Sequence, residues 1–304
     1  MQDIDSKILN KLIAVKVLLN DALKSVNESG VQRAFAILHT HNALDWMFQI
    51  AYSGTVGAKK NEKMYIEYYA REVNKSIPKL IDIGNLSRVN TLRKNFKHDF
   101  IFPDLELTKE LISWAENQIN TICQRIFHIS LAEIDLVIAI ASPEIKEQIT
   151  KADDVFSGGK VPEAFCELAI AFAMVKYDLQ ERIEKLTDRN AIFETDFTFS
   201  NSFFLHIRDM GNLVGEGYKI AETWDQIIKS TEYLINMSFI NFLGIGMYEF
   251  FQFQAITPKP LRTMNGKYHC SINERLAVKM RASEYSKCRN FVIEGALKAQ
   301  SKVL

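Results

Sequence analysis

Apolar residues recur at helical spacing along most of the chain. Over the first 26 residues they fall three and four positions apart, and this spacing places them on one face of a long amphipathic helix. These positions are Ile4, Ile8, Leu12, Val15, Leu19, Leu23 and Val26. We expect Gly30 to stop this helix, because glycine is common just past a helix C-terminus.

Further apolar stripes predict that the first half of the chain is a bundle of four or five helices. The stretches that carry these stripes are Val31–Tyr52, Glu62–Lys75, Asn85–His98 and Leu105–Ile140. A loop at Ser53–Lys60, a break at Pro78 and the segment Phe100-Ile-Phe-Pro103 separate them. Glycine and proline interrupt helices, so these separations are expected to be turns or loops.

Ser142-Pro143 marks the expected domain boundary. Proline is favoured in the first turn of a helix, so a new helical segment should start here. We therefore expect two domains, 1–141 and 142–304, each of ordinary domain size. A strong helical stretch at Lys160–Leu186, with the residues before it, is similar to one helical hairpin of a tetratricopeptide unit. That unit occurs once, so no repeat array is predicted.

The rest of the second half shows a change of pattern. Phe193–Phe204 is rich in Phe and Thr and could be extended, and a helical pattern then continues to about Phe251. Asn265-Gly266 between short alternating segments predicts a small β-hairpin at Leu261–Cys270. A final helix is expected from Asn273 onward. The predicted fold class is all-α, with this one hairpin.

Composition restricts the partners and the location. The 37 basic residues balance 37 acidic ones, so no chain-wide field attracts a long polyanion, and any nucleic-acid contact must be local. The four cysteines are too widely spaced for a CxxC zinc site and too few for a disulfide framework. Reduced thiols and a cytoplasmic location are therefore expected.

No segment has the pattern of a signal peptide or of a membrane span. The N-terminus is acidic and then amphipathic, without the basic and apolar regions of a signal peptide. The most apolar window, Tyr233–Ile256, contains Asn236, Asn241, Glu249 and Gln252, whereas a span needs ~20 mainly apolar residues. We interpret this window as buried core and expect no membrane contact.

Arg93-Lys-Asn-Phe-Lys-His98 is the one stretch that points to specific chemistry. It fits the pattern of an arginine, four residues and a histidine, but Arg33 to His39 and Arg262 to His269 fit nearly as well. Context separates them. Leu86, Val89, Arg93 and Phe96 share one helical stripe, so Arg93 lies where an apolar residue is expected and its charge must be paired or functional.

Arg93 and His98 can act together only under one condition. Successive helical residues are turned by ~100°, so these two side chains differ by about 140°. They converge within one chain only if the helix frays or ends near Lys97, and Pro103 soon afterwards favours such an end.

The helical context of this motif resembles that of the HEPN superfamily. Two long helices and a break precede Leu92-Arg-Lys-Asn-Phe-Lys-His-Asp-Phe-Ile-Phe-Pro103, and one more long helix follows it. The second helix, with Asp45 among apolar residues, is similar to the helix that carries an acidic residue in that family. The resemblance covers about residues 1–140. Lys94 departs from it, because many active members have Asn at this position.

The resemblance implies a metal-independent endoribonuclease that acts on RNA as a homodimer, with a composite site between two copies. It further implies a toxin or effector in a prokaryotic stress or phage-defence system. Arg93 and His98 would be catalytic: His98 can exchange a proton with the ribose 2′-hydroxyl or the leaving oxygen, and Arg93 can hold the phosphate. Asp45 would support Arg93, and Lys94, Asn95 and Lys97 would support the motif.

Two alternatives stay open. Arg93 could pair with Asp45 and simply hold the bundle together, and His41 one turn from Asp45 is expected to form a buried hydrogen-bonded pair with it. The protein would then be a non-catalytic scaffold or adaptor that dimerises or binds a partner protein, a function that Lys94 and the neutral charge favour. A nucleotide-binding role for the second half is weaker, because no phosphate-binding motif supports it.

No metal or cofactor is predicted. The remaining histidines have no carboxylate or cysteine companion at ligand spacing. They are His39, His128, His206 and His269.

Overall fold

The computed structural model of the chain describes residues 5–57, 65–187, 217–263 and 265–302. These residues are mainly helical, which confirms the predicted fold class. The chain divides into two compact units, Met1–Leu136 and Val137–Leu304, a few residues before the expected boundary at 141/142. The Phe/Thr-rich stretch Phe193–Phe204 lies outside the described residues.

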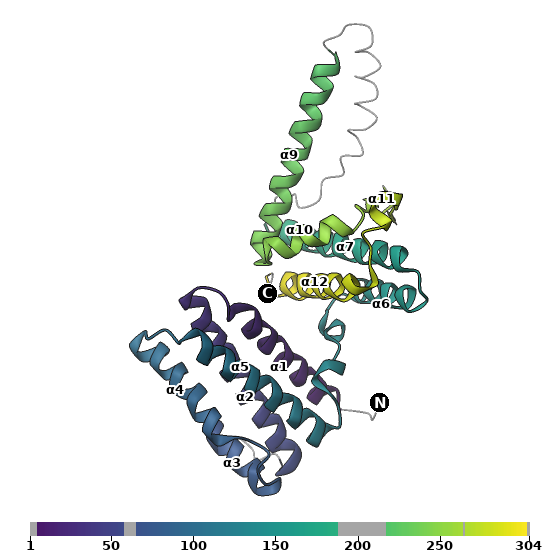
Figure 1. Cartoon of the computed structure of the whole chain (residues 1–304). Helices are drawn as coiled ribbons and strands as arrows, with labels where there is room; N and C mark the ends of the chain where they lie inside the picture. The colour runs from purple at the N-terminus through teal and green to yellow at the C-terminus, as the bar shows by residue number, and fades with distance from the viewer. Residues whose placement is uncertain (1–4, 58–64, 188–216, 264, 303–304) are drawn as a thin grey trace. The chain divides into compact units, whose positions relative to one another are not determined.

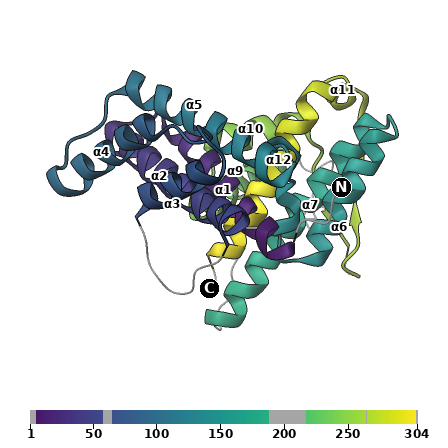
Figure 2. The same cartoon turned by 90° about the horizontal axis from the view of Figure 1, so that it is seen from below.

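The first unit is a helical bundle, and its helices lie side by side in both views (Figures 1 and 2). Its α-helices are α1 (Ser6–Ser25), α2 (Gly30–Thr55), α3 (Ile66–Ser76), α4 (Ile83–Asp99) and α5 (Leu105–Ile122). Gly30 was expected to stop the first helix. Instead α1 ends at Ser25 and Gly30 is the first residue of α2, where the ring of Phe102 packs against it.

α2 is the central helix of this bundle. It contacts α1, α3, α4 and α5. Its buried residues are spread around the helix rather than along one stripe, as expected of a helix covered on most sides. They are Ala34, Ala36, Ile37, Thr40, His41, Ala43, Leu44, Met47, Phe48, Ile50, Ala51 and Tyr52. A polar group on the buried part of this helix must therefore find its partners inside the bundle.

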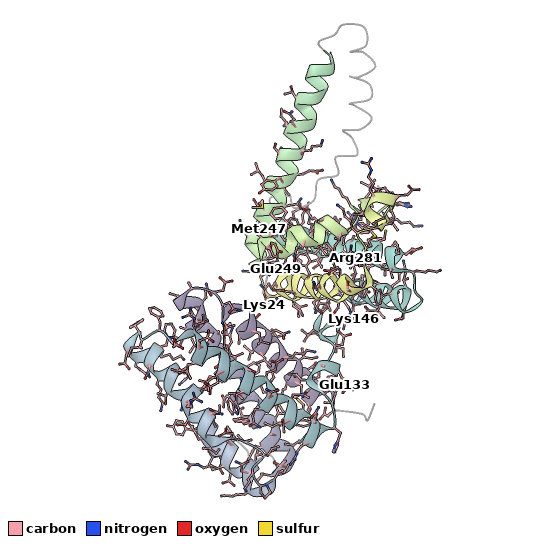
Figure 3. All side chains as sticks on the ribbon, in the orientation of Figure 1. Lys24, Glu133, Lys146, Met247, Glu249 and Arg281 are labelled. Carbon is pink, nitrogen blue, oxygen red and sulfur yellow. The ribbon has the colours of Figure 1, made fainter. Side chains whose placement is uncertain are left out.

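The helix predicted for Leu105–Ile140 ends earlier. α5 is followed by a π-turn at Cys123–Phe127, and His128 adopts a left-handed conformation with φ 55°. Beyond it, the carboxylate of Glu133, labelled in Figure 3, accepts a hydrogen bond from the backbone N–H of Ser130 at 2.6 Å. Side chains that bond nearby backbone groups compete with helix formation, and a helical pattern does not reveal them.

The second unit packs long helices around an aromatic core. Its longer helices are α6 (Pro143–Ser157), α7 (Val161–Thr187), α9 (Gly217–Leu243), α10 (Met247–Ile256) and α12 (Ala282–Ser301). Ser142 caps α6 and Pro143 occupies its first turn, as the sequence pattern predicts. α6 and α7 form a helical hairpin, and α12 packs on α7.

Two features of the second unit differ from the prediction. The window Tyr233–Ile256 is not wholly buried: Phe239, Phe250 and Phe253 are buried, but another side of its helices exposes Tyr233, Leu234, Phe242, Tyr248 and Phe251. The final helix is also broken. A short helix, α11 (Glu274–Ala277), precedes a turn that buries Met280, and only then does α12 begin.

The predicted β-hairpin is confirmed. β1 (Leu261–Arg262) pairs antiparallel with β2 (Tyr268–His269), with Leu261 opposite His269. Gly266 in the turn has φ 79°, a left-handed conformation that glycine adopts without strain.

A substitution at Phe172 tests the packing of the aromatic core in the second unit. Its ring centroid lies 5.0 Å from that of Phe291 and 5.3 Å from that of Phe253. Phe172→Ala should therefore lower the free energy of unfolding by about 3–5 kcal/mol, measured by urea denaturation. Tyr248→Ala is the matched control, since Tyr248 is 71% exposed, and it should change stability by less than about 0.5 kcal/mol. Equal losses in the two variants would contradict this packing.

Candidate functional site

The Arg93–His98 motif lies on α4, whose two ends are both well defined. At the start, Oδ1 of Asp82 accepts hydrogen bonds from the backbone N–H groups of the first turn, at 2.8 and 3.2 Å. At the other end Phe100 adopts a left-handed conformation with φ 54°, and its N–H donates to the carbonyl of Phe96 at 3.2 Å. The helix is therefore intact through the whole motif.

Arg93 is half-buried on the side of α4 that packs into the bundle. Leu86 and Val89, on the same stripe, are fully buried, as the sequence pattern suggested. The guanidinium acts electrostatically on His41 and Asp45 of the central helix α2. Among the described residues it has no carboxylate within 4.0 Å. The charge of Arg93 is thus held near an acidic group without a direct ion pair.

His41 is a buried, neutral imidazole. It is 8% exposed, and its Nδ1 has no hydrogen-bond partner among the described residues. Burial, followed by the positive charges of Arg93 and Lys97, lowers its pKa from 6.5 to about 4, and a hydrogen bond with Asn42 and the charge of Glu67 oppose this. A histidine with this pKa is poorly matched to proton transfer near neutral pH, so a positioning role suits it better than an acid–base one.

Asp45 is half-buried one turn from His41. Burial raises the pKa of its carboxyl, and the charge of Glu67 acts in the same direction. A hydrogen bond with Gln49 and the charge of Arg93 oppose that rise. The predicted hydrogen bond between His41 and Asp45 is not found among the described residues. Nδ1 of His41 has no partner there, and the carboxyl of Asp45 shares a hydrogen bond with Gln49.

Glu67 and Asn90 complete this group and were missed in the sequence. Asn90 of α4 is buried, and its amide Nδ2 donates to Oε1 of Glu67 on α3 at 2.5 Å. The sequence held one sign of this group: Asn90, a polar residue on the apolar stripe of α4 three residues before Arg93. We call Arg93, His41, Asp45, Glu67 and Asn90 the polar cluster, since they join α2, α3 and α4 inside the bundle.

The other predicted site residues lie outside the polar cluster. Lys94, Lys97 and His98 are exposed and Asn95 is half-buried. Lys97 is close enough for its charge to lower the pKa of His41, so it lies at the edge of the cluster.

His98 does not converge with Arg93 in a single chain. α4 continues to Asp99, so the two residues keep the helical separation of about 140° around the axis and about 7.5 Å along it. Arg93 is half-buried and its charge acts on His41 and Asp45 of α2, while His98 is exposed. The fraying that would bring them together does not occur in this structure, so joint action requires a second molecule.

An exposed apolar surface adjoins the His98 end of α4. Its members are Val31, Phe35, Phe100, Ile101 and Phe102, with exposed fractions between 42% and 75%. Phe96 links the two sides of this surface, with its ring centroid 6.1 Å from that of Phe35 and 5.9 Å from that of Phe102. We call the five exposed residues, without Phe96, the apolar patch. Contiguous exposed apolar surface commonly marks an interaction site.

The arrangement offers two chemical groups on two sides of one helix. A half-buried guanidinium in a weakly screened setting can bind a phosphate oxyanion strongly. An exposed imidazole at the helix end can exchange protons with bound substrate. The polar cluster holds the first group in place, and the patch beside the second offers a contact surface.

Comparison of the chain with protein-family models, with curated proteins and with solved structures finds no match. The HEPN resemblance stays a prediction that rests on the motif and its helical context.

Two searches of the described residues bear on other classes of site. No group of three or more His, Cys, Asp or Glu side chains in the described part of the chain could hold a metal ion. Across the same residues, no helix has both the length and the apolar composition to cross a membrane.

The buried His41 makes the stability of the first unit depend on pH. Its pKa is depressed on folding from 6.5 to about 4, so its favourable neutral state is fully present above pH 6.5 and is lost as the pH falls toward 4. This loss amounts to about 3 kcal/mol of unfolding free energy. His41→Gln should remove it, so the variant should lose less stability than the wild type between pH 7 and pH 4.

Urea denaturation at several pH values measures this difference. The exposed His269 supplies the control, because His269→Gln should keep the pH dependence of the wild type. If His41→Gln lost as much stability on acidification as His269→Gln, His41 would not be a buried neutral group.

Proposed function

We propose that the chain is a cytoplasmic, metal-independent endoribonuclease of HEPN type that acts as a homodimer with a composite site. The observation that carries the proposal is that Arg93 and His98 lie on different sides of α4. Arg93 is held in the polar cluster, while His98 is exposed about 140° away, next to the apolar patch. A second copy seated on the patch would bring another motif to this end of the helix.

The proposed reaction uses the RNA's own 2′-hydroxyl as nucleophile. His98 accepts the 2′-hydroxyl proton or donates a proton to the leaving 5′-oxygen, and with two copies in one cleft each role has a histidine. Arg93 of the facing copy binds the phosphate and stabilises the charge that develops on it. Lys94 and Lys97, both exposed, contact the flanking backbone. The products are a 2′,3′-cyclic phosphate and a 5′-hydroxyl.

The biological setting follows from the resemblance alone: a toxin or effector in prokaryotic defence. The second unit would sense a signal, regulate the site or recruit a partner protein.

A non-catalytic scaffold is the second candidate. It is favoured by the continuity of α4, because Arg93 in one chain belongs to a packed cluster and His98 stays apart from it. In this case the apolar patch would still join copies or bind a partner protein, and Arg93 would only stabilise the bundle.

Cleavage of mixed RNAs, including tRNA, in EDTA separates these functions. Arg93→Ala and His98→Ala should each lower the cleavage rate by at least ~100-fold with an unchanged circular dichroism spectrum, because each removes one partner of the reaction. Arg88→Ala on the same helix and His269→Ala are the matched controls and should cut at the wild-type rate, since both residues are exposed. Mass spectrometry should find 2′,3′-cyclic phosphate ends. If neither the wild type nor any variant cleaved RNA, the ribonuclease proposal would be wrong and the scaffold would remain.

Assembly through the apolar patch can be tested with a substitution that respects the backbone. Phe100 is 75% exposed in the left-handed conformation, which asparagine tolerates, so Phe100→Asn with Ile101→Glu should remove apolar surface without strain. Light scattering should give a dimer for the wild type and a monomer for this double variant. The double variant should also lose RNA cleavage.

Val278→Glu is the control for this change. Val278 is 78% exposed in the second unit, and its variant should stay dimeric and active. A wild-type monomer at ~50 μM, or a double variant that dimerises normally, would argue against the patch as the contact between copies.

A further inference from the structure

A cleft with a volume of about 260 Å³ lies among three helices of the second unit. It is lined by the segment that leads into α6, by the second half of α7 and by the last turns of α12. Both α6 and α12 pack on α7, as Figure 1 shows. Ligand pockets commonly have volumes of about 300–1,000 Å³, so this cleft matches a small molecule at the lower end of that range.

The floor of the cleft is aliphatic. Five of its lining residues are at most 4% exposed, and all five have apolar side chains: Ile140, Ile145, Val175, Ala296 and Ala299. An aliphatic group of a ligand that lies on this floor is removed from water, which favours binding. A polar group there would lose its hydrogen bonds to water, since the floor side chains offer none in return.

A charged pair from α7 forms the rim of the cleft. Asp178 and Arg182 are four residues apart, on the same face of α7, and Oδ2 of Asp178 lies 2.8 Å from Nη2 of Arg182. Nη2 also donates to the carbonyl of Ala299 at 3.2 Å, so the last turn of α12 fixes the guanidinium. Among the described residues, Nη1 of Arg182 and Oδ1 of Asp178 have no hydrogen-bond partner.

The other polar side chains of the cleft are used to hold its walls together. The amide of Gln300 accepts a hydrogen bond from the backbone N–H of Ala141 at 2.8 Å and donates one to the carbonyl of Ala139 at 2.9 Å. The hydroxyl of Ser142 caps α6. The end of α12 is thus tied to the segment before α6, and the charged pair of α7 is left to meet a ligand.

We propose that this cleft binds a free aliphatic amino acid in its zwitterionic form. The ligand carboxylate accepts hydrogen bonds from Nη1 of Arg182, and the ligand ammonium group donates to Oδ1 of Asp178. The aliphatic side chain of the ligand lies on the floor. The proposal is independent of the ribonuclease proposal.

The charges of the rim select this class of ligand. A simple anion would be repelled by the carboxylate of Asp178, and a simple cation would be repelled by the guanidinium of Arg182. A zwitterion brings one charge of each sign, so both rim groups gain a partner. The aliphatic floor then favours a branched aliphatic side chain over a polar one.

Isothermal titration calorimetry of the full-length protein with L-leucine, L-isoleucine and L-valine tests the proposal. At least one of them should bind one-to-one with a Kd below ~1 mM. Two analogues of leucine test the role of charge: isocaproate lacks the ammonium group and isopentylamine lacks the carboxylate. Each should bind at least ~10-fold more weakly than leucine, because it leaves one charge of the rim without a partner.

Substitutions locate the binding site. Ala296→Leu extends an aliphatic side chain over the floor without changing a hydrogen-bonding side chain, so it should abolish binding with an unchanged circular dichroism spectrum. Asp178→Asn and Arg182→Gln should each weaken binding at least ~10-fold. Lys185→Gln is the matched control: Lys185 forms the next ion pair of α7, with Glu181, but does not line the cleft, so this variant should bind as the wild type does.

Three results would overturn the proposal. They are a Kd above ~1 mM for all three amino acids, analogues that bind as tightly as leucine, and undiminished binding in Ala296→Leu. If the substitutions disturbed the fold, the comparison of leucine with its two analogues would decide, because it uses the wild-type protein alone.

Discussion

The central helix α2 imposes the constraint on which the first unit depends. It is covered by four neighbouring helices, and yet it carries His41 and Asp45, whose polar groups cannot reach bulk water freely. Burial disfavours the charged form of both side chains, and the pKa of each shifts accordingly. Arg93 of α4 favours the charged form of Asp45, and Glu67 of α3 favours the charged form of His41, so charges from α3 and α4 act on the polar groups of α2.

The same constraint separates Arg93 from His98 in the motif on α4. Arg93 is half-buried because the face of α4 that carries it also carries the fully buried Leu86 and Val89, and it keeps an accessible part that can meet a substrate. An intact helix then carries His98 away from Arg93 and toward the apolar patch. A site that needs both groups must take one from another molecule, which links the proposed chemistry to assembly. The second unit has its own core around Phe172, which does not depend on this arrangement.

The parts of the fold that follow from periodicity were predictable. α2, α4, α7 and the hairpin around Asn265-Gly266 occur close to their expected positions because their apolar spacing and turn residues act locally. The irregular stretch after α5 was not predictable, since it contains side-chain hydrogen bonds to the backbone such as that of Glu133 with Ser130. In the site, Arg93 and Asp45 were anticipated from their apolar surroundings. Glu67 was not, because its partner Asn90 comes from a different helix.

The most direct test of the composite site is complementation between two inactive variants. Arg93→Ala and His98→Ala proteins are mixed, exchanged through mild denaturation and refolding, and assayed for RNA cleavage in EDTA. A mixed dimer keeps one Arg93 from one chain and one His98 from the other, and it lacks the second histidine of the cleft. The account therefore predicts that mixing raises the activity well above that of either variant alone, to a rate below that of the wild type. If each variant is inactive and the verified mixed dimer is inactive too, while the wild type cuts, Arg93 and His98 do not act across two chains and the account is contradicted.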